Sequence, residues 1–175
     1  MTVPPLLPLD PGIRLVIFDA DGTLRWTTVE GQPCPNDESE WRLMPNVRER
    51  LRVLDFGPHG LKLGVASNQG GVAVGYLSAD MARKLLVDTV DAALGFVPPD
   101  AAIELCICHP QRACDRRKPS SGMLRRIMDR FAIPPDATLF VGDLDVDRDA
   151  ARRARTRFAW SGEFFGGNHA PSRGP

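Results

Sequence analysis

The sequence predicts an α/β protein built on a doubly wound parallel sheet. Short apolar runs that end in polar or glycine-containing turns are the candidate strands, at residues 14–19, 62–67, 103–107, 137–142 and 157–160. Stretches with helical spacing of apolar residues separate them, at residues 46–55, 79–94, 121–131 and 147–155. Strands that alternate with helices form a parallel sheet covered on both faces, so we expect that architecture here.

Length and composition favour one compact domain. The chain has 175 residues, of which 43% are hydrophobic, enough for a single sizeable core. We expect one domain over residues 13–165, a monomer, with poorly ordered ends at 1–12 and 166–175, which are rich in proline or glycine. The formal net charge of +0 gives no general attraction for nucleic acid. No apolar run is long enough to span a membrane, which favours a cytoplasmic location.

The first candidate strand leads directly into two carboxylates. Arg14-Leu15-Val16-Ile17-Phe18 is followed by Asp19-Ala20-Asp21-Gly22-Thr23. Open α/β sheets bind ligands at the carboxyl ends of their strands, and carboxylates held there need a cation, hydrogen bonds or a shared proton. Taken alone, the segment is equally compatible with an Asp-Gly turn in water.

Three later segments add chemistry of the same kind. They are Ser67-Asn68-Gln69-Gly70-Gly71, Arg116-Arg117-Lys118-Pro119, and Gly142-Asp143 with Asp145, Asp147 and Asp149. The first can direct N–H and hydroxyl groups toward an anion, the second places a cation before a helix, and the third supplies metal-binding carboxylates. Together the four segments predict a site that binds an anion and a cation.

The segment Leu24–Trp41 breaks the alternation of strands and helices with Gly31, Pro33 and a polar run. It is too short to form a domain of its own, so we expect a flap beside the first carboxylates that selects what binds there. The alternative is an ordinary surface connection whose tryptophans pack at the edge of the sheet.

The four segments, in this order, resemble the motifs of the haloacid dehalogenase superfamily of aspartate-nucleophile phosphatases. Asp19-Ala20-Asp21-Gly22-Thr23 matches the first motif, Ser67-Asn68 the second, Lys118 the third, and Gly142-Asp143 with Asp147 the fourth. The resemblance covers roughly residues 13 to 160. It implies a phosphatase without a large cap domain.

The resemblance also implies residue roles. Asp19 is expected to be the nucleophile and Asp21 the general acid and base. Mg²⁺ is expected to bind the Asp19 carboxylate, the Asp21 carbonyl and Asp143, with Asp147 in its outer shell. The residues expected to bind phosphate or substrate are Ser67, Asn68, Gln69, Arg117 and Lys118.

Within the superfamily, the chain resembles subfamily IIIA and its branch of histidinol phosphatases and D-glycero-D-manno-heptose 1,7-bisphosphate phosphatases. The resemblance rests on the segment from Ser67 to Tyr76 and on the cysteine-containing loop before Lys118. It implies a small phosphate ester, a sugar or amino-alcohol phosphate, as substrate. Val74 stands where this branch often has arginine, and Leu144 where the heptose enzymes have lysine, so we expect contacts to a second substrate phosphate to be missing.

The same branch carries a structural zinc loop. Here Cys106, Cys108 and Cys114 supply three sulfur ligands, His109 is a candidate fourth, and Arg116 replaces a cysteine of the pattern. Two interpretations of this loop stay open. It binds Zn²⁺, or it is free of metal and Cys106 is a small buried residue of the core. Three cysteines between residues 106 and 114 favour a metal or structural cluster over a disulfide framework.

Two other functions stay open. The Ser-Asn-Gln region also resembles the 3′-phosphatase half of polynucleotide kinase-phosphatases, so a nucleic-acid 3′-phosphatase is an alternative. The late arginines Arg152, Arg153, Arg155 and Arg157 would support it only if they form a binding surface rather than a solvated helix face. The second alternative is a catalytically idle relative that binds phosphate, against which the intact Asp19 and Asp21 argue.

Overall fold

The structure is a computed structural model that describes residues 8–166. Five parallel strands form one sheet in the order β5-β4-β1-β6-β7. Their bounds are β1 Leu15–Phe18, β4 Lys62–Asn68, β5 Ala102–Cys106, β6 Thr138–Gly142 and β7 Arg157–Trp160. β1 lies in the centre, with Leu15 paired to Lys62 of β4 and to Thr138 of β6. The predicted doubly wound parallel sheet is confirmed.

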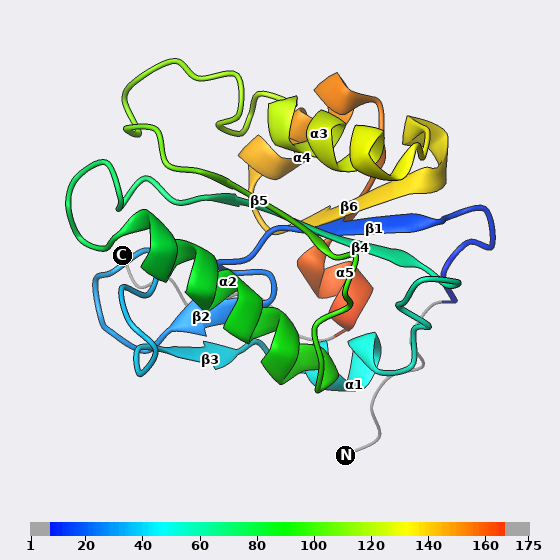
Figure 1. Cartoon of the computed structure of the whole chain (residues 1–175), viewed down its shortest axis with the longest axis horizontal. Coiled ribbons are helices and arrows are strands. Elements are labelled where there is room, and N and C mark those ends of the chain that lie inside the picture. The colour runs from blue at the N-terminus through cyan, green and yellow to red at the C-terminus, as the bar shows by residue number, and fades with distance from the viewer. Residues whose placement is uncertain (1–7, 167–175) are drawn as a thin grey trace.

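Helices cover both faces of this sheet (Figure 1). α3 and α4 lie on one face, and α1, α2 and α5 lie on the other. Their bounds are α1 Val47–Leu51, α2 Ala79–Leu94, α3 Gly122–Phe131, α4 Asp145–Ala154 and α5 Ser161–Phe165, and a short 3-10 helix at Pro135–Ala137 precedes β6. The sheet is therefore the middle of three layers.

Alternate side chains of β1 reach the two cores. Leu15 and Ile17 belong to the core under α3 and α4, whereas Val16 and Phe18 belong to the core under α1, α2 and α5. All four are fully buried. Because successive residues of a strand point to opposite faces, a strand covered on both faces must be apolar throughout, as this one is.

Two helices differ in extent from the predictions. α4 begins at Asp145, two residues early, because the Asp147 carboxylate accepts hydrogen bonds from the N–H groups of Asp143 and Leu144. The helix predicted over residues 46–55 ends at Leu51, and the Leu54 N–H bonds to the Leu51 carbonyl as the chain turns toward β4. α2 spans its predicted range and is capped by the Ser78 hydroxyl.

The segment after β1 contains a hairpin that the sequence pattern did not predict. β2 Arg25–Thr27 and β3 Trp41–Leu43 pair antiparallel and form a separate two-stranded sheet. The loop of residues 28–40 joins them. The hairpin lies on the same face of the main sheet as α2 (Figure 1). Its two strands hold both ends of the predicted flap.

The packed part of the chain begins before Ile13. Leu9 packs against the core under α2, and Asp10 forms an ion pair with Arg157 of β7. The rest of the two predicted disordered ends, residues 1–7 and 167–175, lies outside the described residues. Within the described part, no helix combines the length and apolar character needed to cross a membrane.

Candidate active site

The polar residues predicted at strand ends lie together at the carboxyl edge of the sheet. β1, β4 and β6 are parallel neighbours, so the residues that follow them share one edge. These residues border a cavity of about 800 Å³. Among its lining residues are Asp19, Asp21, Ser67, Asn68, Arg117, Lys118 and Asp147. Segments far apart in the sequence therefore build one site.

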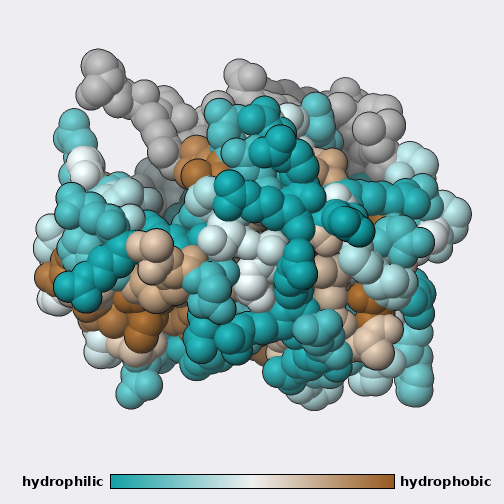
Figure 2. Space-filling view, turned by 90° about the horizontal axis from the view of Figure 1, so that it is seen from above, coloured by the Kyte–Doolittle hydropathy of each residue, from teal (hydrophilic) through white to brown (hydrophobic). Residues whose placement is uncertain are grey.

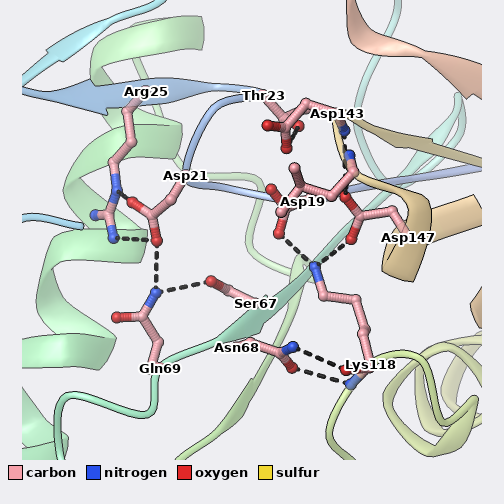
Figure 3. Close-up of polar contacts among 11 residues, drawn as sticks. Asp19, Asp21, Thr23, Arg25, Ser67, Asn68, Gln69, Lys118, Asp143 and Asp147 are labelled. Carbon is pink, nitrogen blue, oxygen red and sulfur yellow. Dashed lines mark hydrogen bonds and ion pairs between the residues drawn. The ribbon is translucent and has the colours of Figure 1, made fainter. Parts of the chain in front are cut away.

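Lys118 lies between two carboxylates in this cavity (Figure 3). Its Nζ donates a hydrogen bond to Asp19 Oδ1 and forms an ion pair with Asp147 Oδ1 at 2.8 Å. Only 4% of Lys118 and 1% of Asp147 is exposed. Buried charges require partners of this kind, and the pairing holds the ammonium group beside Asp19.

Burial controls the electrostatics of this cluster. Burial raises the pKa of Asp19 well above its usual value, Lys118 opposes that shift, and Asp147 and Asp143 add to it. Burial lowers the pKa of Lys118, but Asp147 and Asp19 outweigh this effect and raise its pKa above the usual range. The lysine is therefore charged at neutral pH, and an added cation near Asp19 would favour the carboxylate form of that residue.

Carboxylate oxygens gather beside Lys118 as a metal site requires. Ligand oxygens of Asp19, Asp143 and Asp147 all lie within 4.8 Å of one another. The Thr23 hydroxyl donates to Asp143 Oδ1 at 3.3 Å and orients that side chain. Gly22 has a φ of +92°, and a Cβ there would lie 2.3 Å from Asp143 Oδ2, so only glycine leaves room for this carboxylate.

Asp21 has a buried partner that the sequence analysis missed. Arg25 Nε lies 2.7 Å from Asp21 Oδ1, and Arg25 Nη1 donates to the Thr89 hydroxyl of α2 at 3.2 Å. Arg25 is fully buried although it lies in the short strand β2. The spacing of four residues between Asp21 and Arg25 is the only local signal for this pair. The burial of Arg25 depends on how α2 packs against the hairpin.

Gln69 links Asp21 to Ser67. Its Nε2 donates to Asp21 Oδ2 at 2.8 Å and to Ser67 Oγ at 2.7 Å. Gln69 is fully buried, and the cavity is lined by Ser67 and Asp21 instead. The geometry makes Gln69 a support for these two side chains (Figure 3).

Asn68 holds the backbone of Lys118. Its Nδ2 donates to the Lys118 carbonyl at 3.1 Å, and its Oδ1 accepts from the Lys118 N–H at 3.0 Å. These two hydrogen bonds tie the end of β4 to the segment before α3 (Figure 3). The Asn68 amide therefore positions Lys118, while the side chain also borders the cavity.

The remaining charged candidates divide between the cavity and the surface. Arg117 lines the cavity, with Nη1 3.5 Å from the Cys108 carbonyl oxygen. Asp145 and Asp149 instead form ion pairs with arginines three residues later, on the outer side of α4. Their positions agree with the expectation that they face solvent.

The flap borders the cavity. Its loop contributes Gly31, Gln32, Pro33, Cys34 and Asn36 to the lining. Burial raises the pKa of the Cys34 thiol to about 11, and the charge of Asp21 adds to the shift, so this thiol is protonated at neutral pH. The flap is thus placed to contact whatever occupies the cavity.

The predicted zinc ligands are only partly brought together. Ligand atoms of Cys106, Cys108 and Cys114 lie within 4.8 Å of one another, but Cys108 and Cys114 are joined in a disulfide, which the sequence did not predict. The loop between them folds back until their Cα atoms are 6.6 Å apart. His109 is outside this group, and its Nδ1 accepts from the Gln111 N–H at 3.2 Å.

Comparisons with known proteins identify relatives over most of the chain. The family model described as polynucleotide kinase 3 phosphatase matches residues 14–169. The D-glycero-beta-D-manno-heptose-1,7-bisphosphate 7-phosphatase of Pseudomonas putida is 32% identical over 145 residues, which are 79% of this chain and 77% of that protein. The Pseudomonas aeruginosa enzyme of the same name is 33% identical over 144 residues, 79% of this chain and 75% of that enzyme.

A solved structure shows the same fold. The D,D-heptose 1.7-bisphosphate phosphatase from B. bronchiseptica, crystallised with magnesium and phosphate, aligns with a TM-score of 0.66 and 28% identity. The alignment covers 85% of this chain and 79% of that one. The similarity in fold therefore extends over most of the chain.

Proposed function

Because the chain belongs to the polynucleotide kinase 3 phosphatase family of haloacid dehalogenase-type phosphatases, we propose that this phosphatase hydrolyses a small phosphomonoester through an aspartyl-phosphate on Asp19. One observation supports the proposal above all others. Asp19 lies in the cavity beside a buried, charged lysine, with the carboxylate of Asp143 close by. A nucleophile, a fixed positive charge and a cation site are therefore within reach of one phosphoryl group.

In the first step, an Asp19 carboxylate oxygen attacks phosphorus as the bond between phosphorus and the leaving oxygen breaks. The electron pair goes to the leaving oxygen, which takes a proton from Asp21. Lys118 and the Ser67 hydroxyl lie in the cavity to stabilise the charge on the transferring group. Asn68 and Asp147 act by holding Lys118 in place.

In the second step, water attacks the phosphorus of the aspartyl-phosphate. Asp21 accepts the proton of that water, and the bond between phosphorus and Asp19 breaks to release inorganic phosphate. Asp21 must serve in both steps from one place, and the contacts from Arg25 and Gln69 fix its side chain there.

The chain's donor set fits Mg²⁺. The ion prefers oxygen ligands, and the carboxylates of Asp19 and Asp143 with the Asp21 carbonyl would hold it. When bound, Mg²⁺ neutralises charge between these carboxylates and the phosphate oxygens. Asp147 is engaged by Lys118 and by two backbone N–H groups, which suits an outer-shell role. Zinc has no role in these steps: of the three close sulfur atoms in the cysteine loop, those of Cys108 and Cys114 are joined in a disulfide, which leaves Cys106 as the one free thiol of the three.

Mg²⁺ should stabilise the folded protein through these carboxylates. At one hundred times its dissociation constant, the ion should add about 2.7 kcal/mol to the free energy of unfolding, measured by thermal denaturation without substrate. Asp143→Asn should lose most of this gain, while Asp145→Asn, which changes a surface residue of α4, should retain it. An equal gain in all three proteins would place the ion elsewhere.

Asp21→Asn should affect poor leaving groups most. An alkyl phosphate needs protonation of its leaving oxygen, whereas an activated aryl phosphate needs little. We expect kcat/KM to fall at least about tenfold more for the alkyl ester than for the aryl ester. Asp136→Asn, at an exposed position before β6, is the matched control. Equal losses on both esters would remove Asp21 from the acid role.

A nucleic-acid 3′-phosphatase is the second candidate, favoured by the family model that matches the chain. Against it, Arg152 pairs with Asp149 and Arg157 with Asp10, so part of the late arginine cluster is neutralised within the chain. Comparing kcat/KM for a small alkyl phosphate and a 3′-phosphorylated oligonucleotide, with Mg²⁺, separates the two. A higher kcat/KM for the oligonucleotide would assign the protein as a nucleic-acid 3′-phosphatase. If neither ester is hydrolysed, the protein is a catalytically idle relative that binds phosphate.

A further inference from the structure

The outer wall of the active-site cavity is apolar. Val74 and Tyr76, from the loop after β4, and Leu144, at the start of α4, line it with exposed fractions of 43%, 70% and 38%. Val146 and Pro33 add to the same lining. Figure 2 shows a mostly hydrophilic face with a hydrophobic patch toward the side on which the loops after β4 and β5 lie in Figure 1. Exposed apolar side chains that border a cavity are available to a ligand.

Positive charge is scarce in this wall. Among the described residues that line the cavity, only Lys118 and Arg117 carry cationic side chains. Lys118 is engaged by Asp19 and Asp147 at the reacting end. Arg117 Nη1 lies near Gly70 and the Cys108 carbonyl, at the loops after β4 and β5. A second phosphate placed against Val74 or Leu144 would lose water to apolar side chains, and Arg117 is the single cation of the described lining that is not held at the reacting end.

We infer that the cavity selects phosphomonoesters whose alcohol part is apolar and carries no second phosphate. This inference rests on the proposed function and narrows its substrate class. The phosphoryl group binds between Asp19 and Lys118, and the alcohol part extends along Val74, Tyr76 and Leu144 toward the flap. An aliphatic or aromatic alcohol part loses water favourably against Val74 and Leu144, whereas a hydroxyl group placed against either of these side chains finds no hydrogen-bond partner in it.

Three six-carbon esters test the inference. Hexyl phosphate, hexane-1,6-diyl bisphosphate and sorbitol 6-phosphate all release a primary alcohol, so the need for a proton from Asp21 is similar. We expect kcat/KM for hexyl phosphate to exceed that for each of the other two by at least about tenfold, the discrimination that an apolar pocket typically achieves. p-Nitrophenyl phosphate, an activated aryl ester whose leaving group needs little protonation, reports whether the protein hydrolyses phosphate esters at all.

Charge-insertion variants locate the selectivity in the wall. Leu144→Lys and Val74→Arg should each raise kcat/KM for the bisphosphate about tenfold and lower it for hexyl phosphate, because a charge-assisted contact to the second phosphate becomes available. Val53→Lys is the matched control. Its side chain is 69% exposed and lies outside the cavity lining, so the insertion should change neither value.

The outcomes separate this inference from the proposed function. Hydrolysis of p-nitrophenyl phosphate with equal or reversed ranking of the six-carbon esters would overturn the inference and leave the phosphatase mechanism intact. The same holds if Val53→Lys changes the ranking as much as Leu144→Lys does. Failure to hydrolyse any of the four esters would overturn the proposed function together with the inference.

Discussion

Asp19→Asn is expected to abolish hydrolysis while the fold is retained. An amide is a poor nucleophile, so the variant lacks the attacking group beside Lys118. Among the described residues, Asp147 is the other partner of Lys118, but its second oxygen is held by two backbone N–H groups. We expect kcat to fall on the order of 10⁴-fold or more.

The control for this variant is Asp145→Asn, which removes a carboxylate from the exposed side of α4. It should retain the activity of the natural protein. Rapid quench with a labelled ester and acid precipitation should recover phosphate bound to the natural protein but not to Asp19→Asn. Turnover by Asp19→Asn at a near-natural rate would refute the covalent mechanism.

Lys118→Met is expected to reduce stability as well as activity. The methionine fills similar space but leaves Asp19 and Asp147 without the ammonium group between them. Removing one partner from a buried ion pair typically costs about 3–5 kcal/mol. In metal-free buffer the free energy of unfolding, from urea denaturation, should fall by about this amount.

The loss should depend on pH in a defined direction. Burial raises the folded-state pKa of Asp19 above its value of 3.8, and removal of Lys118, which opposes that shift, raises it further. The folded variant then binds a proton more tightly than the unfolded chain above pH 3.8, so its stability falls as pH rises toward neutrality. The difference in the free energy of unfolding between Lys118→Met and the natural protein should therefore be smallest near pH 4.

Lys84→Met is the matched control for this effect. Lys84 also contacts two carboxylates, Asp88 at 2.6 Å and Glu38 at 3.0 Å, but it is 48% exposed. Solvent screens exposed pairs, so its removal should change stability little. Equal losses from Lys84→Met and Lys118→Met would show that burial does not set the strength of the Lys118 pairing.

Local patterns were enough to predict the sheet and the residues at its carboxyl edge. A strand buried on both faces must be apolar throughout, so β1 was recognisable from Leu15-Val16-Ile17-Phe18 alone. Asp19, Ser67 and Asp143 follow or end such strands, and parallel strands bring their carboxyl ends to one edge. Their proximity therefore followed from the sequence without knowledge of any contact.

The supporting contacts were not predictable in this way. Asn68 binds the peptide groups of Lys118, fifty residues later, and Arg25 is buried because Thr89 of α2 lies against it. The Cys108–Cys114 disulfide likewise depends on how its loop folds back.

The order of apolar runs and motifs along the chain therefore specifies the sheet and the chemical groups at its edge. Which donor meets which acceptor, and the presence of Val74 and Leu144 in the cavity lining, depend on the folded arrangement. This difference arises because a strand's periodicity specifies the face on which a residue lies. The partner of a side chain depends instead on how separate elements pack against one another.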